Sequence, residues 1–305
     1  MGPGEISSHS KSDRPVASRP TFLMCPPTLY DVNYVINPWM AGNVNRSSRC
    51  NATRQWESLH KALTSLARVE LLEQQAGSPD MVFTANAGLV RKGVVALSRF
   101  LHAERQGEEP HFRKWFDDSG FALRELPPAV PFEGEGDALF EADDSRLWAG
   151  YGMRSRRASH DYLWATWGVE VLFLQLIDPR FYHLDTCFCP LFGGYLLYYP
   201  DAFDAESQAK IVSQYDGSKL IAVSVSDALR FACNAINVGK TIILNEVSFE
   251  LVSALEGYGF KVIQVALTEF LKAGGAAKCL VLRLSEMDVT HGWGPTPGFE
   301  SGAAA

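Results

Sequence analysis

The second half of the chain alternates between short apolar segments and segments with helical spacing of hydrophobic residues. This alternation is the strongest constraint on the fold. The expected helices cover 159–168, 204–214, 226–236 and 246–257, and the expected strands cover 169–177, 181–188, 194–199, 219–224, 240–244, 260–265 and 278–284. Short strands separated by helices are typical of α/β proteins. The strands are too numerous for a simple doubly wound sheet, so we expect an α/β fold of another kind.

The first half is consistent with the same fold class. Hydrophobic residues recur at helical spacing from Trp56 to Leu72, so we expect a helix over 54–75 that ends at Gly77-Ser78-Pro79. Short apolar runs predict strands over 22–25, 81–84, 94–97 and 121–126.

The body of the chain has no low-complexity linker. We therefore expect a single domain over residues 21–290, flanked by disordered tails at 1–20 and 291–305. The first twenty residues are rich in Ser and Pro and lack the apolar block of a secretory signal. The six cysteines show no disulfide framework, which favours the reducing cytoplasm.

The charge balance argues against two classes of partner. The chain has 28 basic and 35 acidic residues, a formal net charge of −7. Such a protein gains nothing from counterion release on DNA, and it lacks a polybasic cluster for an anionic membrane. The most apolar stretch, Val169 to Ile177, is far short of the roughly 20 residues that cross a bilayer. We expect neither nucleic acid nor a membrane as partner.

The densest group of reactive side chains lies in the segment Tyr182–Cys189. In a strand, alternate side chains share a face, which would place His183, Asp185, Cys187 and Cys189 together. A His beside an Asp suits general acid/base chemistry. A hydrogen-bonded buried pair or cysteine packing in the core explains the pattern equally well. A zinc site built from both cysteines and His183 is a weaker interpretation, because zinc sites usually show Cys-x-x-Cys spacing.

A second group combines acidic residues with glycines. Glu133, Glu135 and Asp137 alternate with Gly134 and Gly136. Glycine allows a close approach of the backbone to a ligand, and clustered carboxylates suit a cationic substrate or a metal. A solvated acidic turn is the more common origin of such a pattern.

Three further positions are candidates only in combination with others. Asn86 ends the apolar segment Val82–Gly88, where Asn usually serves the turn itself. Arg154 lies in a basic turn that is either an exposed loop or an arginine fork for a carboxylate. Cys279 follows Gly-Gly-Ala-Ala, and a lone cysteine at a strand start is more often a core residue than a nucleophile.

Taken in order along the chain, these motifs resemble the guanidine-modifying superfamily, the penteins. The matching segments are Asn37-Pro38, Phe83–Asn86, Glu133–Asp137, His183 with Asp185, and Cys279. Within the superfamily, Phe22–Pro27, Tyr34–Met40 and Phe83–Gly88 resemble the arginine dihydrolase domain of cyanobacterial enzymes. The resemblance covers residues 22 to about 286. It implies a five-bladed α/β propeller of ββαβ units around a closed active site.

The resemblance also implies a role for each matching residue. Cys279 would be the nucleophile, His183 the general acid/base, Glu133 the carboxylate that pairs with the histidine, and Asp185 the clamp on the guanidinium. The α-carboxylate end of the substrate would be held by Asn37, Arg105 and Arg154. The acidic turn is one residue longer than the Glu-Gly-Gly-Asp of deiminases, so Glu135 and Asp137 stay open as alternatives to Glu133.

The implied reaction is hydrolysis of L-arginine to ornithine, carbon dioxide and two ammonia through a covalent intermediate on Cys279, with no metal and no organic cofactor. Deiminases carry Asp where Asn86 aligns. A carboxylate only accepts hydrogen bonds, whereas an Asn amide also donates. We therefore expect Asn86 to hold the neutral ureido group of citrulline for a second round of hydrolysis.

Several alternatives stay open at this point. Within the superfamily they are an arginine deiminase that stops at citrulline, a dimethylarginine dimethylaminohydrolase and an amidinotransferase. Outside enzymology, the alternative is a non-catalytic pentein that binds an arginine-like ligand. The presence of Cys279, His183, Asp185 and Glu133 argues against a mere binder, which needs no nucleophile. A homo-oligomer is compatible with the sequence.

Overall fold

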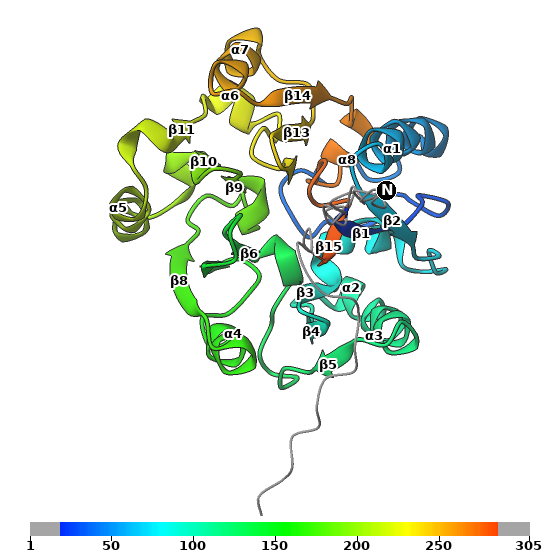
Figure 1. Cartoon of the computed structure of the whole chain (residues 1–305). Coiled ribbons are helices and arrows are strands. Elements are labelled where there is room, and N and C mark those ends of the chain that lie inside the picture. The colour runs from blue at the N-terminus through cyan, green and yellow to red at the C-terminus, as the bar shows by residue number, and fades with distance from the viewer. Residues whose placement is uncertain (1–18, 286–305) are drawn as a thin grey trace, which may run out of the picture.

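The computed structural model describes residues 19–285, and its strands form five three-stranded sheets arranged in a ring like the blades of a propeller (Figure 1). In chain order, the blades are β15 (Leu282–Ser285), β1 (Thr21–Met24) and β2 (Arg68–Leu71); β3 (Gly88–Arg91), β4 (Val94–Leu97) and β5 (Ala122–Arg124); β6 (Ala138–Phe140), β7 (Arg146–Tyr151) and β8 (Glu170–Gln175); β9 (Phe188–Leu191), β10 (Tyr195–Tyr198) and β11 (Leu220–Ala222); β12 (Ile236–Val238), β13 (Thr241–Leu244) and β14 (Lys261–Gln264).

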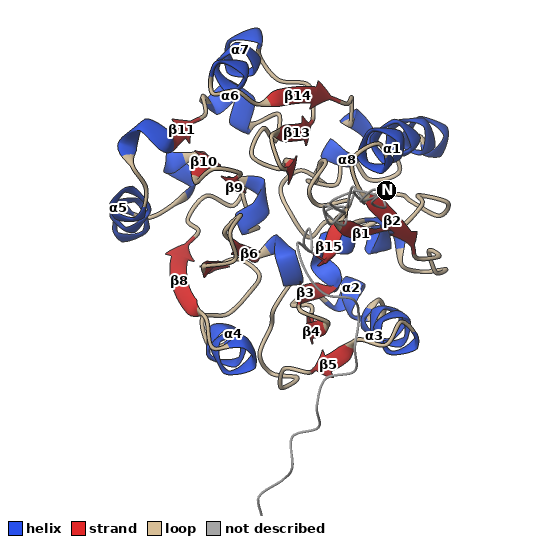
Figure 2. Ribbon diagram, viewed as in Figure 1, coloured by secondary structure: helices blue, strands red, loops and turns tan. Residues whose placement is uncertain are grey.

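Every blade repeats one arrangement. Its first two strands are antiparallel, and its third strand runs parallel to the middle one. A parallel pair needs a crossover connection, which here contains a helix on the outside of the ring (Figure 2). These outer helices are α1 (Arg49–Thr64), α3 (Glu109–Asp118), α4 (Ser159–Trp167), α5 (Ala205–Gln214) and α7 (Phe249–Gly257). The predicted five-bladed propeller of ββαβ units is confirmed.

The remaining helices are short. They comprise the α-helices α2 (Ala103–Gln106), α6 (Val225–Ala228) and α8 (Thr268–Leu271), and the 3₁₀ turns η1 (Pro79–Val82), η2 (Thr84–Ala87), η3 (Gly134–Gly136), η4 (Leu184–Thr186), η5 (Pro200–Ala202) and η6 (Gly217–Lys219).

The first blade is assembled from both ends of the described chain. β15 pairs antiparallel with β1, with Phe22 opposite Arg283 and Leu23 opposite Leu282. The helix of this blade, α1, begins at the N-cap Ser48, whose hydroxyl accepts a hydrogen bond from the Asn51 N–H. Its apolar residues recur at helical spacing and are buried against the blade. The ring is therefore closed by pairing between residues that are far apart in sequence.

One turn in each blade points toward the centre of the ring. In three blades this turn is a 3₁₀ turn directly before the first strand: η2 before β3, η3 before β6 and η4 before β9. In the other two blades, the equivalent turns carry Asn234 before β12 and Cys279 before β15. Repetition of the ββαβ unit thus brings five distant parts of the sequence to one place.

Several predicted elements are wrong. Residues 181–188 do not form a strand: Leu184–Thr186 is a 3₁₀ turn, and β9 begins at Phe188. The strand predicted over 81–84 is also replaced by 3₁₀ turns. Cys279 lies in a turn before β15 rather than in a strand.

Two predicted helices are too long. The helix predicted over 54–75 ends at Thr64, because the apolar residues beyond it belong to β2. The helix predicted over 226–236 is only α6, Val225–Ala228, and the chain turns before β12.

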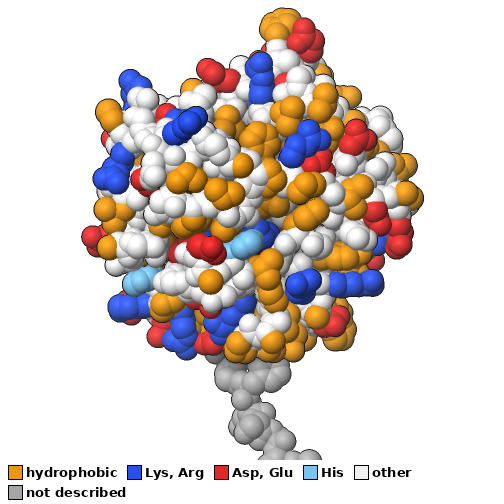
Figure 3. Space-filling model, turned by 180° about the vertical axis from the view of Figure 1, so that it is seen from behind, with side chains coloured by type: hydrophobic (Ala, Val, Ile, Leu, Met, Phe, Trp, Pro, Cys, Tyr) orange, Lys and Arg blue, Asp and Glu red, His pale blue; other side chains and the backbone are white. Residues whose placement is uncertain are grey.

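The tails are expected over 1–20 and 291–305. Residues 1–18 and 286–305 lie outside the described residues, and the limits of the expected domain stay a prediction. Within residues 19–285, no helix combines the length and apolar character needed to span a bilayer. On the face shown in Figure 3, basic and acidic side chains are interspersed around the edge of the molecule.

Candidate active site

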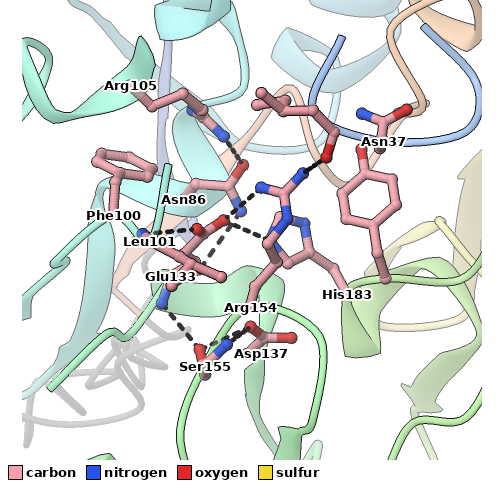
Figure 4. A network of polar contacts seen from close by, with 12 residues as sticks. Asn37, Asn86, Phe100, Leu101, Arg105, Glu133, Asp137, Arg154, Ser155 and His183 are labelled. Atoms are coloured by element: carbon pink, nitrogen blue, oxygen red, sulfur yellow. Dashed lines mark hydrogen bonds and ion pairs between the residues drawn. The ribbon is translucent and has the colours of Figure 1, made fainter. Parts of the chain in front are cut away.

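His183 and Glu133 form a buried pair across two neighbouring turns. The Nε2 atom of His183 lies 2.7 Å from Oε2 of Glu133 (Figure 4). The same carboxylate oxygen accepts a hydrogen bond from Nη1 of Arg154 at 3.1 Å, and Oε1 accepts one from the main-chain N–H of Leu101 at 3.2 Å. Glu133 is fully buried, so all of its interactions are with protein groups.

The charge of Glu133 is compensated within the protein. Burial by itself would raise the pKa of this carboxyl, but the positive charge of Arg154 and the hydrogen bond with His183 outweigh burial and hold the pKa well below its usual range. Glu133 is therefore ionised and fixes the orientation of the imidazole ring, as a carboxylate does for a catalytic histidine.

The other two carboxyl groups of the acidic turn face elsewhere. Asp137 accepts hydrogen bonds from the main-chain N–H and the hydroxyl of Ser155, and from the N–H of Leu184. Burial raises the pKa of Asp137 to about 6. Glu135 pairs with Lys278 at 2.6 Å. Asp137 thus ties the turns of two blades together, and of the three carboxylates it is Glu133 that contacts His183.

Cys279 and Asp185 face each other on the opposite side of the site. The Cys279 sulfur lies 3.3 Å from Oδ2 and 3.7 Å from Oδ1 of Asp185. The side-chain amide of Asn234 donates to the same sulfur at 3.1 Å. All three side chains are buried.

Among residues 19–285, no Lys or Arg side chain forms an ion pair with Asp185 or a hydrogen bond with the Cys279 sulfur. Burial and the adjacent carboxylate of Asp185 raise the pKa of the Cys279 thiol well above its usual value. Burial likewise raises the pKa of Asp185 to about 7, although Lys278 acts in the opposite direction. A cationic group placed between Cys279 and Asp185 would lower both pKa values.

A small cavity connects the two sides. It is lined by Ile36, Asn37, Met40, Asp80, Phe83, Asn86, Arg105, Arg154, Tyr182, His183, Ala273, Gly275 and Cys279. Most predicted site residues therefore line a single cavity. Glu133 and Asp185 contact the lining residues His183 and Cys279, respectively. Asp137 links the neighbouring turns through hydrogen bonds with Ser155 and Leu184.

Asn86 and Arg105 meet at the wall of this cavity. Oδ1 of Asn86 accepts a hydrogen bond from Nη1 of Arg105 at 2.8 Å, and Nδ2 of Asn86 lies 3.3 Å from the carbonyl oxygen of Glu133 (Figure 4). Arg105 also makes a two-pronged ion pair with buried Glu108, at 3.0 and 2.9 Å. Arg105 thus occupies the oxygen of Asn86, and one N–H of the Asn86 amide is directed to the carbonyl of Glu133.

Asn37 and Arg154 line the same part of the cavity wall, since Arg154 contacts the residue before Asn37. Oδ1 of Asn37 accepts hydrogen bonds from the N–H groups of Trp39 and Met40, and its Nδ2 donates to the carbonyl of Ala273. Arg154 donates to the carbonyl of Ile36 at 2.9 Å and stacks on the ring of Tyr182, with 4.6 Å between guanidinium carbon and ring centre. The basic turn is thus a buried arginine site rather than an exposed loop.

The sequence analysis missed two buried polar residues of the site. Asp80 lines the cavity, and its Oδ2 accepts a hydrogen bond from the hydroxyl of Tyr34, whereas Oδ1 has no hydrogen-bond partner in the described part of the chain. Asn234 contacts Cys279 but lies in the unremarkable segment Phe231–Ile236. Neither position has a local pattern; the sole signal was the polarity of each residue within an apolar stretch.

The alternative of a zinc site finds no matching geometry. Among residues 19–285, no group of three or more His, Cys, Asp or Glu side chains is placed to hold a metal ion. His183 is engaged with Glu133, and the thiols of Cys187 and Cys189 face main-chain carbonyls, at 3.5 Å from Leu184 and 3.5 Å from Ala235. All six cysteines are free.

Comparisons with known proteins find close relatives over most of the chain. The chain is 56% identical over 271 residues to the bifunctional arginine dihydrolase/ornithine cyclodeaminase AgrE of Nostoc sp., and 58% identical over 264 residues to the enzyme of the same description, ArgZ, of Synechocystis sp.. The matches cover 89% and 87% of this chain, but only 38% and 37% of those longer proteins.

A solved structure is similar over almost its whole length. The N-terminal domain of ArgZ, an arginine dihydrolase from the ornithine-ammonia cycle in cyanobacteria, was solved bound to substrate. It superposes with a TM-score of 0.87 at 57% identity, covering 88% of this chain and 98% of that domain. The family model described as N,N dimethylarginine dimethylhydrolase, eukaryotic, matches residues 33–286. With its five ββαβ blades and central Cys–His–Glu site, the chain belongs to this family of guanidine-modifying penteins.

Proposed function

We propose that this chain is an arginine dihydrolase, which hydrolyses L-arginine to ornithine, carbon dioxide and two ammonia. The observation that carries the proposal is the arrangement around the cavity. A thiol and a carboxylate that contact no cation within residues 19–285 lie on one side, and a histidine hydrogen-bonded to the charge-compensated Glu133 lies on the other. The similarity to proteins described as arginine dihydrolases supports the choice of substrate and product.

The first steps follow from the charges of these groups. The guanidinium of arginine supplies the cation that Asp185 and Cys279 lack, which favours the thiolate. The sulfur attacks the guanidinium carbon and forms a C–S bond. His183, held by Glu133, then gives a proton to one terminal nitrogen, the C–N bond breaks and ammonia leaves. An S-alkylthiouronium remains on Cys279.

The covalent intermediate is then hydrolysed. His183 takes a proton from water, which attacks the same carbon, and the C–S bond breaks to release citrulline. In a second round, the Cys279 sulfur attacks the ureido carbon of citrulline, and the terminal nitrogen takes a proton and leaves as ammonia. A second water attacks the same carbon and the C–S bond breaks, which gives ornithine with a carboxylated side-chain nitrogen. Loss of carbon dioxide then leaves ornithine. We assign to the Asn86 amide the role of donating to the ureido oxygen of citrulline during this round.

The other end of arginine carries an α-carboxylate and an α-ammonium group. We assign the carboxylate to Arg154, Arg105 and Asn37, which line the cavity. A guanidinium has five N–H donors, and Arg154 uses two of them on Glu133 and Ile36. We assign the ammonium to Asp80, whose Oδ1 is buried and unpartnered within the described residues.

A second candidate is hydrolysis of N-methylated arginines. The family model that matches residues 33–286 is described as a dimethylarginine dimethylhydrolase, which favours this second candidate. Both candidates use the same Cys279 and His183, so products and substrate preference must separate them. A thiol nucleophile also needs reducing surroundings, which supports a cytoplasmic location.

Product analysis tests the proposal. The protein is incubated with L-arginine, and citrulline, ornithine, urea and ammonia are quantified over time. Cys279→Ser serves as the control, in which turnover should fall at least about 10³-fold. Ornithine with two ammonia per arginine and no urea supports the dihydrolase. Accumulation of citrulline with one ammonia contradicts it, and turnover of dimethylarginine alone favours the second candidate.

A further inference from the structure

We infer that Asn234 is a positioning residue for the nucleophile: its side-chain amide holds the Cys279 sulfur as a hydrogen-bond acceptor and fixes the turn that carries it. The inference rests on the proposed role of Cys279 and adds to it a residue that never needs to touch the substrate. Asn234 is completely buried and lies in the turn before β12, which is the counterpart, one blade earlier, of the turn that carries Cys279.

The hydrogen bonds leave one orientation for the Asn234 amide. Its Oδ1 lies 3.0 Å from the main-chain nitrogen of Ala276 and 3.1 Å from that of Cys279. Both nitrogens are donors, so the atom between them must be the oxygen. The Nδ2 atom therefore faces the Cys279 sulfur at 3.1 Å and the carbonyl of Asp185 at 3.1 Å. The sulfur accepts a hydrogen bond from this amide.

The main chain strengthens the same link. The carbonyl of Asn234 accepts a hydrogen bond from the N–H of Lys278 at 3.2 Å. With the two bonds to Oδ1, the residue binds three main-chain N–H groups of the segment 276–279. Asn234 therefore determines where the sulfur lies as well as what it contacts.

The amide donor matters because the other side chains near the sulfur act differently, and the main-chain N–H of Ala276, which Asn234 also binds, acts in the same direction as the amide. Asp185 faces the sulfur with a carboxylate that opposes ionisation of the thiol, and Tyr182 lines the same cavity. Lys278, which precedes Cys279 in the chain, directs its ammonium group to Glu135. His183 lines the same cavity but is hydrogen-bonded to Glu133. An N–H donor to sulfur stabilises the thiolate over the thiol. Asn234 supplies this donor without adding a charge that would repel a cationic substrate.

The chain offers a matched control in Asn245. This residue is also buried, its Oδ1 accepts a hydrogen bond from the N–H of Leu267 at 3.0 Å, and its Nδ2 donates to the carbonyl of Arg230 at 3.0 Å. Asn245 thus bridges two main-chain segments as Asn234 does, but its recorded hydrogen bonds involve no sulfur. Loss of either amide should lower the free energy of unfolding, whereas only loss of the Asn234 amide should raise the pKa of the Cys279 thiol.

The experiment measures the ionisation of Cys279 directly, without turnover. Ligand-free protein is treated with iodoacetamide from about pH 6 to about pH 10, and alkylation of the peptide that contains Cys279 is quantified by mass spectrometry. The variants are Asn234→Ala, which removes the donor without adding charge, and Asn234→Asp, which keeps the acceptor oxygen. Asn245→Ala and Asn245→Asp are treated identically. If the melting curve shows that Asn234→Ala does not fold, Asn234→Ser replaces it.

We expect both Asn234 variants to slow alkylation of Cys279 about tenfold or more across the pH series, because raising a thiol pKa by one unit lowers the thiolate fraction tenfold at every pH below that pKa. The Asn245 variants should leave this rate within about twofold of the wild-type rate. The inference is overturned by an unchanged rate in Asn234→Ala, by an equal loss in Asn245→Ala, or by a loss confined to Asn234→Asp, which would report its added charge. If the expected losses occur but the wild-type protein turns over no guanidine, the proposed function fails and the positioning role stands.

Discussion

The two sides of the cavity differ in how their charges are balanced. On the His183 side, Glu133 is ionised and contacts Arg154, the imidazole and a main-chain N–H. On the Cys279 side, Asp185 faces a thiol, and both groups have raised pKa values. One side is complete in the free protein, whereas the other is completed only by a cation from outside.

This difference separates two demands on one site. A general acid/base must be oriented before the substrate arrives, so its charge partner is built into the fold. Under the proposed function, a clamp for a guanidinium must keep its charge available, so its partner would be the substrate itself. Changing a carboxylate to its amide should therefore have opposite effects on stability on the two sides, and the following predictions test this contrast.

The largest effect is expected from Glu133→Gln. The change leaves Arg154 buried without its negative partner, and breaking a buried ion pair typically costs about 3–5 kcal/mol. Turnover should fall about 10²- to 10⁴-fold, because His183 loses the carboxylate that orients it. Urea denaturation and steady-state kinetics check both. In the exposed pair Lys114–Asp118, Asp118→Asn should leave stability almost unchanged. Equal stability losses in the two variants would contradict the assignment.

Asp185→Asn should abolish most turnover but stabilise the ligand-free protein. The folded-state pKa of Asp185, about 7, lies above its ordinary value of 3.8, so the folded protein binds more protons between these two values. As the pH rises from about 3.8 to about 7, Asp185 therefore lowers the free energy of unfolding progressively. Above about pH 7 this destabilisation is fully present. We expect Asp185→Asn to gain about 1–3 kcal/mol at pH 8 and little near pH 4. Urea denaturation at both pH values measures this difference. A loss of stability in Asp185→Asn at pH 8 would contradict the prediction that buried Asp185 destabilises the ligand-free protein.

Asn86→Asp should change the product rather than stop the reaction. The new carboxylate still accepts from Arg105 but has no N–H to offer the ureido oxygen of citrulline. Citrulline should accumulate, and the ratio of ornithine to citrulline should fall about tenfold or more, since one hydrogen bond to a reacting group accounts for about 1.4 kcal/mol or more. Chromatography of the products measures the ratio, with Asn245→Asp as the control. Ornithine as main product at an unchanged rate would remove this role from Asn86.

The smallest effect is expected from Gly136→Ala, which tests how closely the two sides are packed. A Cβ at this position would lie 2.3 Å from Nδ2 of Asn86 and 3.3 Å from Cγ of His183, so one of them must move. We expect a loss of about 1–3 kcal/mol in stability and a fall in turnover of about tenfold. Gly107→Ala is the control, because its Cβ would meet nothing within 4 Å. Wild-type kinetics in Gly136→Ala would show that Asn86 and His183 can move aside without loss of activity, contrary to this prediction.

The sequence anticipated the members of the site better than the local structure that carries them. The ordered motifs gave the propeller and placed Cys279, His183, Asn86 and the arginines at one cavity. The segment 181–188 was misread because its alternation of polar and apolar residues fits a strand, whereas Leu184–Thr186 forms a 3₁₀ turn that directs Asp185 to Cys279. Periodicity could not distinguish these two because the segment is short.

Two other gaps have a different physical cause. The helix predicted over 54–75 extends beyond the observed end at Thr64 because the apolar residues of β2 continue the helical spacing. In the structure, these residues form a strand because β2 pairs with β1. Asn234 and Asp80 carried no local signal, since their roles depend on partners 45 residues away in one case and 46 in the other. Such contacts exist only once the ring has formed.

The position of Cys279 beside the strand that closes the ring has a consequence for synthesis. β15 follows Cys279 directly in the chain and pairs with β1, so a ribosome must make almost the whole described chain before the nucleophile can meet Asp185. Under the proposed function, a chain that stops before the last strand is inactive. Activity therefore reports that the two ends of the described chain have joined, because chains without β15 lack the pairing with β1 that closes the ring beside Cys279.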